Sequence, residues 1–249
     1  MGKVISSLRG SIGYLRLNCP DQRNAISKDM WRAIPTEMNA LETQGARVIV
    51  VLGEGDGFSS GANTQEAAQI SSHADAADLW HTIRDSLKAV AAVELPTIAM
   101  IHGSCFGGGC LLACACDLRI ASSDSVIGIP VARLGLTLDD GTMLRLVSLI
   151  GPAHAKRLLF TGDSMDGTEA EKIGLVNFVV SHSRLRAATD ELANRILANV
   201  QFSIQSGKKS INRIVSQSLL ASEANDDEVV GAFISEAFQQ KVKEKKQKK

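Results

Sequence analysis

Apolar residues in the first half of the chain follow two spacings, one typical of strands and one typical of helices. Residues 4–8 and 12–17 flank Gly10, a pattern that predicts a β-hairpin. The β-branched run at 47–52 predicts a buried strand, and the apolar run at 97–101 predicts another, directly before three consecutive glycines. These segments are expected to supply the strands of the core.

The segments between these runs carry apolar residues at helical spacing. Ser27 is a favoured N-cap, and the apolar positions that follow it as far as Leu41 predict a helix, although Pro35 perturbs it. Residues 73–93 predict a second helix with one apolar face. Further along, the pattern predicts short strands at 117–121 and 126–129, helices at 142–150 and 153–160, a helix start at Thr168, and a strand at 175–180.

From about Arg184 onward only amphipathic helical segments remain. Strands that alternate with helices predict an α/β core with parallel strands, so we expect two regions, an α/β core at residues 1–183 and a helical region at residues 184–249. The residues from Lys241 onward are strongly basic. We expect a solvated, frayed tail there, and the alternative is a contact with a phosphate-bearing ligand or a neighbouring subunit.

Composition and charge exclude several classes of partner. The chain has 249 residues, of which 45% are hydrophobic and 22% charged, as is ordinary for a globular protein. Lys plus Arg and Asp plus Glu number 27 each, so no net field favours nucleic acid, and we expect no nucleic-acid partner. No apolar run approaches the roughly 20 residues that a membrane span needs, so we expect no membrane partner.

The five cysteines are Cys19, Cys105, Cys110, Cys114 and Cys116. Four of them cluster around the glycines, yet they lack the paired C-x-x-C spacing and the nearby histidine pair of structural zinc sites, so we expect no metal. Cys110 and Cys114 lie one helical turn apart among Leu and Ala, and this spacing predicts small buried hydrophobic side chains. An odd count without a recognisable signal peptide indicates a reducing compartment, and we expect a cytoplasmic protein.

The three consecutive glycines Gly107, Gly108 and Gly109 open a predicted helix. Bare backbone N–H groups at the positive end of a helix dipole bind an anion or polarise a carbonyl, whereas the simpler alternative is a tight turn. A second glycine-rich loop, 53–61, also follows an apolar strand. Because parallel strands end at the same edge of a sheet, one N–H from each loop is able to form an oxyanion hole, unless both loops are unrelated structural turns.

An ordered series of short motifs runs from near the N-terminus to about residue 180. The motifs are Asn24-Ala25, Phe58-Ser-Ser-Gly-Ala-Asn63, Pro96-Thr-Ile-Ala-Met-Ile-His-Gly103, Gly107-Gly-Gly-Cys-Leu-Leu-Ala113, Cys116-Asp-Leu-Arg-Ile-Ala121, Leu159-Phe-Thr-Gly162 and Ala170-Glu-Lys-Ile-Gly-Leu-Val176. This series resembles the enoyl-CoA hydratase/isomerase (crotonase) family. The resemblance implies a crotonase-like spiral of repeated ββα units, C-terminal helices that mediate trimerisation, and a homotrimer or homohexamer.

The resemblance also implies acyl-CoA thioester substrates and places the oxyanion-hole donors on the backbone N–H groups of Ala62 and Gly108. The positions that it implies for substrate and CoA binding are Ala62, Asn63, Thr64, Gln65, Gly107, Leu111 and Val131. A thioester carbonyl held by two amides gains enolate character, which acidifies the neighbouring C–H. This mechanism needs no metal and no redox cofactor, and coenzyme A enters only as part of the substrate.

The chain departs from the family pattern at the two glutamates of a hydratase, which fall on Leu111 and Val131. Neither side chain transfers a proton, so we expect an isomerase or lyase rather than an efficient hydratase. Asp139 is the candidate substitute, because its spacing from Val131 resembles that of the dienoyl-CoA isomerase branch. The alternative is that Asp139 or Asp140 caps the helix that follows.

A second hypothesis uses Asp139 as a nucleophile. The pair Trp80-His81 resembles a Trp-His pair of the 4-chlorobenzoyl-CoA dehalogenase branch, which implies a dehalogenase or thioester hydrolase in which His81 activates water. The alternative for His81 is a surface histidine. A third hypothesis is a non-catalytic acyl-CoA-binding subunit that has lost its acid/base groups.

Overall fold

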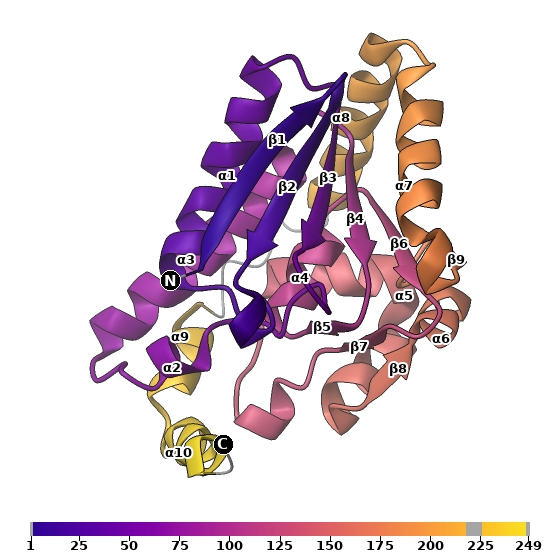
Figure 1. Ribbon diagram of the computed structural model, residues 1–249. Coiled ribbons are helices and arrows are strands. Elements are labelled where there is room, and N and C mark those ends of the chain that lie inside the picture. The colour runs from indigo at the N-terminus through magenta and orange to yellow at the C-terminus, as the bar shows by residue number, and fades with distance from the viewer. Residues whose placement is uncertain (1, 218–225, 248–249) are drawn as a thin grey trace.

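The computed structural model describes residues 2–217 and 226–247, which form two sheets surrounded by helices (Figure 1). The strands are β1 (Lys3–Arg9), β2 (Ile12–Asn18), β3 (Val48–Gly53), β4 (Thr97–Ile101), β5 (Ser104–Phe106), β6 (Leu118–Ser122), β7 (Val126–Gly128), β8 (Ser164–Asp166) and β9 (Phe178–Val180). The helices are α1 (Lys28–Thr43), α2 (Thr64–Ala67), α3 (His73–Ala92), α4 (Gly108–Ala115), α5 (Asp140–Thr161), α6 (Gly167–Lys172), α7 (His182–Leu197), α8 (Gln201–Gln217), α9 (Asp226–Ile234) and α10 (Glu236–Gln247).

The larger sheet has the strand order β1-β2-β3-β4-β6-β9, and the smaller one has the order β5-β7-β8. β1 and β2 form the predicted antiparallel hairpin, and β2, β3, β4, β6 and β9 run parallel. Twice, a strand of the larger sheet is followed by a strand of the smaller sheet and then by a helix, as β4-β5-α4 and β6-β7-α5. These are repeated ββα units of the expected kind.

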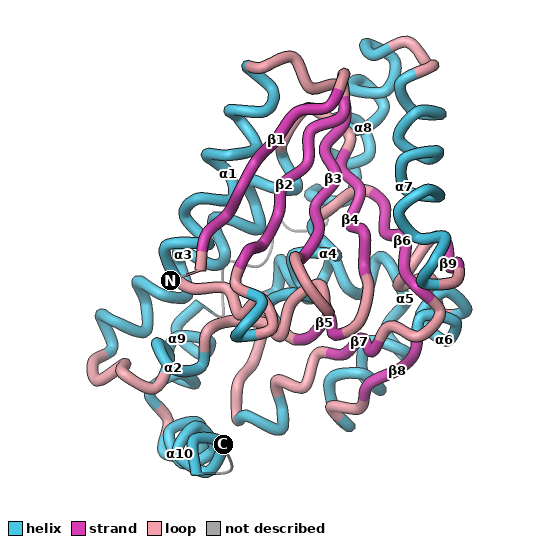
Figure 2. The backbone as a smooth tube through the Cα atoms, in the orientation of Figure 1, coloured by secondary structure: helices cyan, strands magenta, loops and turns pink. Residues whose placement is uncertain are grey.

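Both faces of the larger sheet are covered, as Figure 2 shows. Every residue of β3 is buried, and its side chains alternate between two cores because successive residues of a strand point to opposite faces. Ile49 and Val51 join the core that includes residues of α1, α3 and α4, whereas Val48 and Val50 join the core that α7 covers. A strand buried on both sides therefore has the continuous apolar run that the sequence displays.

The expected boundary at 183/184 falls inside α7, which begins at His182. Leu185 and Leu192 of this helix are buried in the second core, against the larger sheet. The first helix of the predicted C-terminal region is thus one of the layers of the α/β core.

The structure corrects the expectation that the glycines follow an apolar strand directly. β5 lies between β4 and Gly107, and the chain leaves the larger sheet at Gly103, whose φ is +51°. A Cβ at Gly103 would lie 2.0 Å from the carbonyl oxygen of Asp56, so a side chain does not fit at this turn. The turn passes the chain into the smaller sheet, where β5 pairs with β7.

The basic segment from Lys241 onward was expected to be a frayed tail, and the structure differs from this expectation. α10 continues the chain as a helix to Gln247, and Phe238 and Val242, one turn apart on it, are buried in the main core. These apolar side chains anchor a helix whose other positions are mostly polar or charged, so the basic segment is helical over its described part.

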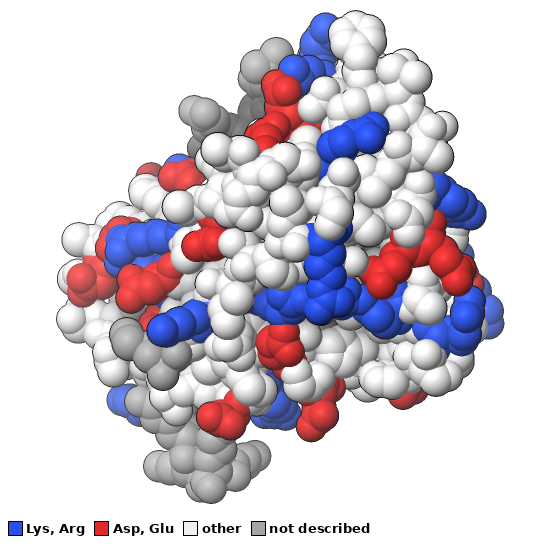
Figure 3. Space-filling view, turned by 45° about the horizontal axis from the view of Figure 1, so that its top comes forward, with Lys and Arg blue, Asp and Glu red and all other residues white. Residues whose placement is uncertain are grey.

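The predicted helices at 142–150 and 153–160 are two halves of α5, which kinks at Gly151 (φ 72°, ψ 164°). The predicted strand at 175–180 is shorter, because the N–H groups of Leu175 and Val176 bond to the carbonyl of Ala170 and close α6. Within the described part of the chain, no helix is both long and apolar enough to cross a membrane. A band of Lys and Arg side chains crosses one face, with acidic side chains beside it (Figure 3).

Candidate functional site

Two glycine-containing turns meet at one edge of the larger sheet. The loop after β3 is bonded to β5, because the N–H of Ser59 donates to the carbonyl of Ser104 (2.9 Å) and that of Phe106 donates to the carbonyl of Ser59 (2.9 Å). The same loop is bonded to the segment before α1, where the N–H of Ile26 donates to Gly61 (2.8 Å). The end of the loop is therefore held beside the start of α4.

This contact brings the two predicted oxyanion-hole donors together. A Cβ built on Gly108 would lie 3.2 Å from the backbone nitrogen of Ala62, and one built on Gly61 would lie 3.3 Å from the nitrogen of Gly108. Neither the N–H of Ala62 nor that of Gly108 donates a hydrogen bond to any residue that the structure describes. Two adjacent amides at partly exposed positions are thus left for a ligand.

The start of α4 has no side-chain cap. Its N-cap residue is Gly107, with φ 49° and ψ −121°, a conformation that residues with a Cβ rarely adopt. The N–H groups of the first helical turn carry the partial positive charge of the helix dipole. The predicted turn is therefore a helix N-terminus that places positive potential beside Ala62.

Two buried polar side chains hold the loop, and no pattern in the sequence predicts the role of Ser59. Its Oγ donates to the carbonyl of Asn24 (2.7 Å) and accepts from the N–H of Gly61 (3.1 Å). Asn24 Nδ2 donates to the carbonyls of Glu54 (2.7 Å) and Gly57 (2.8 Å). The loop geometry is thus fixed by bonds that the molecule makes without a ligand.

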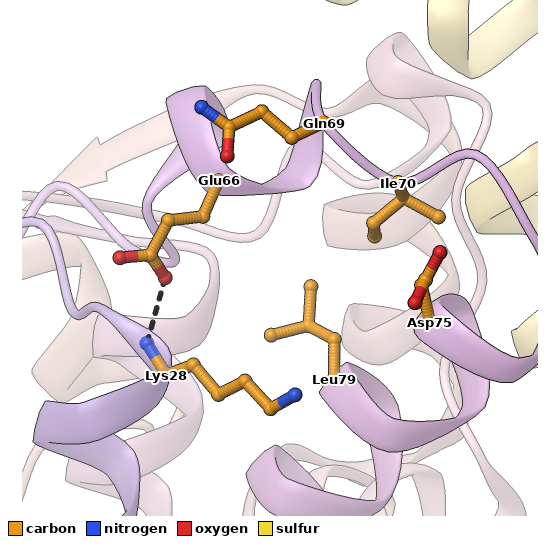
Figure 4. A pocket seen from close by; sticks show the side chains of 6 residues that line it. All are labelled: Lys28, Glu66, Gln69, Ile70, Asp75 and Leu79. Carbon is orange, nitrogen blue, oxygen red and sulfur yellow. Dashed lines mark hydrogen bonds between the residues drawn. The ribbon is translucent and has the colours of Figure 1, made fainter.

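The four predicted CoA-binding positions after the loop begin α2. Asn63 is its N-cap and accepts from the N–H of Gln65 (2.9 Å), and Thr64 is the first helical residue. Figure 4 shows the cavity beside this helix, where a Glu66 oxygen accepts from the N–H of Lys28 (2.8 Å). The residues that line this cavity are Lys28, Glu66, Gln69, Ile70, Asp75 and Leu79.

The positions of the missing glutamates lie in different surroundings. Leu111, one turn into α4, is buried and lines a cavity enclosed by α3, α4 and α5. Val131, just before a short 3₁₀ turn at Ala132–Leu134, is half-buried against the main core. Asp139 lines the same cavity as Leu111.

Asp139, rather than Asp140, is the N-cap of α5. Its Oδ1 accepts from the N–H groups of Gly141 (2.9 Å) and Thr142 (3.1 Å), and its Oδ2 accepts from the Thr142 hydroxyl (2.5 Å). The expected capping role is therefore present. The same carboxylate is also the acidic side chain that lines the cavity, so the cap and the candidate acid/base are one residue.

The structure does not bring His81 to Asp139. His81 Nε2 lies 3.8 Å from Oδ2 of Asp226 on α9, and Trp80 Nε1 donates to Oδ1 of the same carboxylate (3.2 Å). Arg84 also pairs with Asp226. His81 does not line the cavity that holds Asp139, because the Trp80-His81 pair is engaged by the C-terminal helices.

Four of the cysteines are buried around α4. Burial raises the pKa of Cys116 to about 12, and a hydrogen bond with Cys105 raises the pKa of Cys110 well above its usual value. The thiols of Cys110 and Cys116 therefore stay protonated, and the buried cysteines pack as small apolar side chains. Among the described residues, no group of three or more His, Cys, Asp or Glu side chains is arranged to hold a metal ion.

Comparison with known proteins identifies the family. A sequence model of the enoyl-CoA hydratase/isomerase family matches residues 7–248. The chain is 32% identical over 240 residues to the short-chain-enoyl-CoA hydratase of Clostridium acetobutylicum, covering 96% of this chain and 88% of the relative. It is 31% identical over 213 residues to the mitochondrial Delta(3,5)-Delta(2,4)-dienoyl-CoA isomerase of Dictyostelium discoideum, covering 81% and 73%.

Solved structures agree with this result. The crystal structure of an enoyl-CoA hydratase/isomerase from Xanthobacter autotrophicus Py2 superimposes with a TM-score of 0.90 at 27% identity, covering 98% of this chain and 93% of that one. An enoyl-CoA hydratase/carnithine racemase from Magnetospirillum magneticum gives a TM-score of 0.83 at 28% identity, covering 100% and 94%. This chain therefore has the crotonase-like α/β fold and belongs to the enoyl-CoA hydratase/isomerase family.

Proposed function

We propose that this chain is an enzyme that binds an acyl-CoA thioester with the carbonyl oxygen between the N–H groups of Ala62 and Gly108. The observation that carries the proposal is the adjacency of these two amides, neither of which has an acceptor in the described part of the chain. The names of the two relatives support a thioester as the ligand. Two such donors stabilise the negative charge that develops on the oxygen when an enolate forms.

We assign the proton transfer to Asp139. In this step the carboxylate removes a proton from a carbon atom of the bound acyl group, and the electron pair moves to the thioester oxygen. The proton then returns to a different carbon atom of the acyl group. The result is a double-bond isomerisation. A lyase reaction would pass through the same enolate intermediate. Leu111 has no group that positions water, which argues against efficient hydration, although one of the two relatives is named a hydratase.

We place the CoA moiety along the start of α2, beside the cavity of Figure 4. Ala62 links the two parts of this site, because its backbone nitrogen lies beside Gly108 while the next residue, Asn63, caps α2. Gly107 and Val131 complete the substrate-binding set as the family resemblance implies. The proposed step uses only backbone amides and one carboxylate.

A second candidate is a binding-only subunit, and the hydrogen bonds of Asp139 favour it. All three donors to this carboxylate come from the first turn of α5, as expected for a residue that serves the helix alone. The dehalogenase or thioester-hydrolase alternative needs His81 near Asp139, whereas His81 lies against Asp226.

The test is exchange of the α-hydrogens of a saturated acyl-CoA in deuterated buffer, followed by NMR, with binding measured in parallel. We expect exchange by the natural chain and a loss on the order of a hundredfold or more in Asp139→Asn. Asn caps helices about as well as Asp, so this variant keeps the fold. Binding without any exchange would favour the binding-only subunit, and a covalent acyl-Asp139 adduct in mass spectra would favour the nucleophile. Absence of acyl-CoA binding would overturn the proposal.

We also propose that the chain assembles as a homotrimer or homohexamer. The side chains of Phe202, Ile211 and Ile214 on α8 are 76%, 63% and 64% exposed, which is unusual for residues of their kind outside an interface. Light scattering of the purified chain measures the assembly directly, and a monomer at micromolar concentration would contradict it.

A further inference from the structure

The cavity beside Asp139 has an apolar wall and a basic end. It lies among α3, α4 and α5 and is partly open to solvent. Leu87, Leu111 and Leu146 give it apolar lining, one from each of the three helices. Arg84, Lys88 and Arg145 also line it. Three cations around one cavity, with a single carboxylate, give it a net positive lining.

Arg145 lacks the partners that a half-buried guanidinium normally has. Buried Arg119 shows the usual arrangement, because its nitrogens donate to the carbonyls of Leu175 (2.8 Å) and Cys116 (2.7 Å) and to Asn177. Arg145 makes no hydrogen bond or ion pair with any residue of the described ranges, and burial lowers its pKa. A cation removed from water without a directly bonded anion is costly, so this position favours an anionic ligand.

The other two cations differ in how far they are engaged. Arg84 already pairs with Asp85 and Asp226, neither of which lines the cavity. Lys88 is exposed and has no ion pair among the residues described. Arg145 and Lys88 are therefore the two cations available to a ligand.

The cavity follows one face of α4 away from the proposed carbonyl site. Gly108, Leu111 and Ala115 are spaced by three and four residues, so they share a face of the helix. At 1.5 Å per residue, Ala115 lies roughly 10 Å along the axis from Gly108. The carboxylate whose charge acts on Arg145 is that of Asp117, which follows the C-terminal end of α4, so the guanidinium lies toward that end.

This arrangement deepens the proposed function and rests on it. An acyl chain whose carbonyl is held at Gly108 and which follows this face passes Leu111 and then meets the basic end. We propose that the substrate carries a second carboxylate at the distal end of its acyl chain, bound by Arg145 with Lys88 beside it. The substrate class is the mono-CoA thioester of a dicarboxylic acid. A guanidinium binds a carboxylate with two parallel hydrogen bonds, which an ammonium does not reproduce.

The carboxylate of Asp139 does not prevent this binding. Its oxygens already accept from the first turn of α5, at Gly141 and Thr142, so its charge is stabilised by the N-terminus of the helix. Asp139 also lies six residues before Arg145 on the same element, roughly 9 Å along the axis at the rise of an α-helix. A distal carboxylate at Arg145 is therefore separated from it, and the carbon chain passes between them.

The experiment compares glutaryl-CoA with valeryl-CoA, saturated thioesters that differ by a carboxylate in place of a terminal methyl group. We expect the natural chain to bind glutaryl-CoA about ten to a hundred times more tightly in calorimetric titrations at low salt. Arg145→Met should remove this preference and leave the affinity for valeryl-CoA within about twofold, and Arg145→Lys should keep part of it. Arg157→Met is the matched control, because Arg157 is exposed, pairs with Glu169 and does not line the cavity.

The outcomes separate the two proposals. Equal affinities of the natural chain for both thioesters, or an unchanged preference in Arg145→Met, would overturn the distal carboxylate site and leave the proposed function standing. Failure of both thioesters to bind would overturn both. A preference that disappears equally in Arg157→Met would show a general effect of net charge, and would also overturn the site.

Discussion

The two helices that flank the cavity begin in opposite ways. α4 starts at Gly107 with no side-chain cap, and the N–H of Gly108 has no acceptor among the described residues. α5 starts at Asp139, whose carboxylate accepts from the N–H groups of Gly141 and Thr142. A helix start that satisfies its own amides adds stability, whereas one that leaves them free beside a second free amide is prepared for a ligand. The carbonyl-binding site is therefore expected at the start of α4, whereas the residue that caps α5 is the candidate for the proton transfer.

Gly108→Ala, at the uncapped helix start, is expected to have the largest effect. The added Cβ would lie 3.1 Å from Cζ2 of Trp31 and 3.2 Å from the nitrogen of Ala62, so the loop that carries Ala62 would have to move away from α4. We expect the α-hydrogen exchange rate to fall on the order of a hundredfold to a thousandfold, about 3–4 kcal/mol of transition-state stabilisation. The exchange assay with a saturated acyl-CoA measures it.

Gly207→Ala on α8 is the matched control. A Cβ there meets no atom within 4 Å, so the exchange rate should stay unchanged while the unfolding free energy rises by up to about 1 kcal/mol. If Gly108→Ala folds normally and exchanges α-hydrogens at the natural rate, the paired amides are not the carbonyl site.

Local patterns were sufficient to predict the elements that carry strong periodicity. β4 and α3 were predicted almost residue for residue, because one is a continuous apolar run and the other has one apolar face at helical spacing. β5 was missed, since three residues are too few to show a period. Its direction is set by the close approach of Gly103 to Asp56, which is a contact between distant parts of the chain.

In the candidate site, too, some features were predicted from the sequence and others depend on contacts between distant parts of the chain. The rule that parallel strands end at one edge predicted that the two glycine loops meet, and the family resemblance named Ala62 and Gly108 as the residues. The surroundings of His81 did not follow, because the carboxylate that engages it belongs to α9, far along the chain. The lack of a described partner at Arg145 was not predictable either. An amphipathic pattern gives no information about which cation lines the apolar cavity.

The second prediction concerns the support behind the uncapped helix. Ser59→Ala removes the hydroxyl that joins the carbonyl of Asn24 to the N–H of Gly61, and leaves both groups buried without that partner. We expect the unfolding free energy in urea to fall by about 1–3 kcal/mol. Ser60→Ala, one residue on, removes a hydroxyl whose only bond, to Gln22, is long and exposed, and should change stability by less than about 0.5 kcal/mol. Equal effects of the two variants would contradict this role for Ser59.

The smallest expected effect tests the capped helix. Asp139→Ala removes the acceptor for Gly141 and Thr142, so the unfolding free energy should fall by about 1 kcal/mol, or about 2–4 °C in Tm. Asp139→Asn should keep the stability, because its side-chain oxygen accepts the same bonds. Scanning calorimetry of the two variants measures the cap, and the exchange rate of the Asn variant measures the proton transfer. If the Asn variant is stable and still exchanges α-hydrogens, Asp139 serves α5 alone, and the contrast between the two helix starts becomes complete.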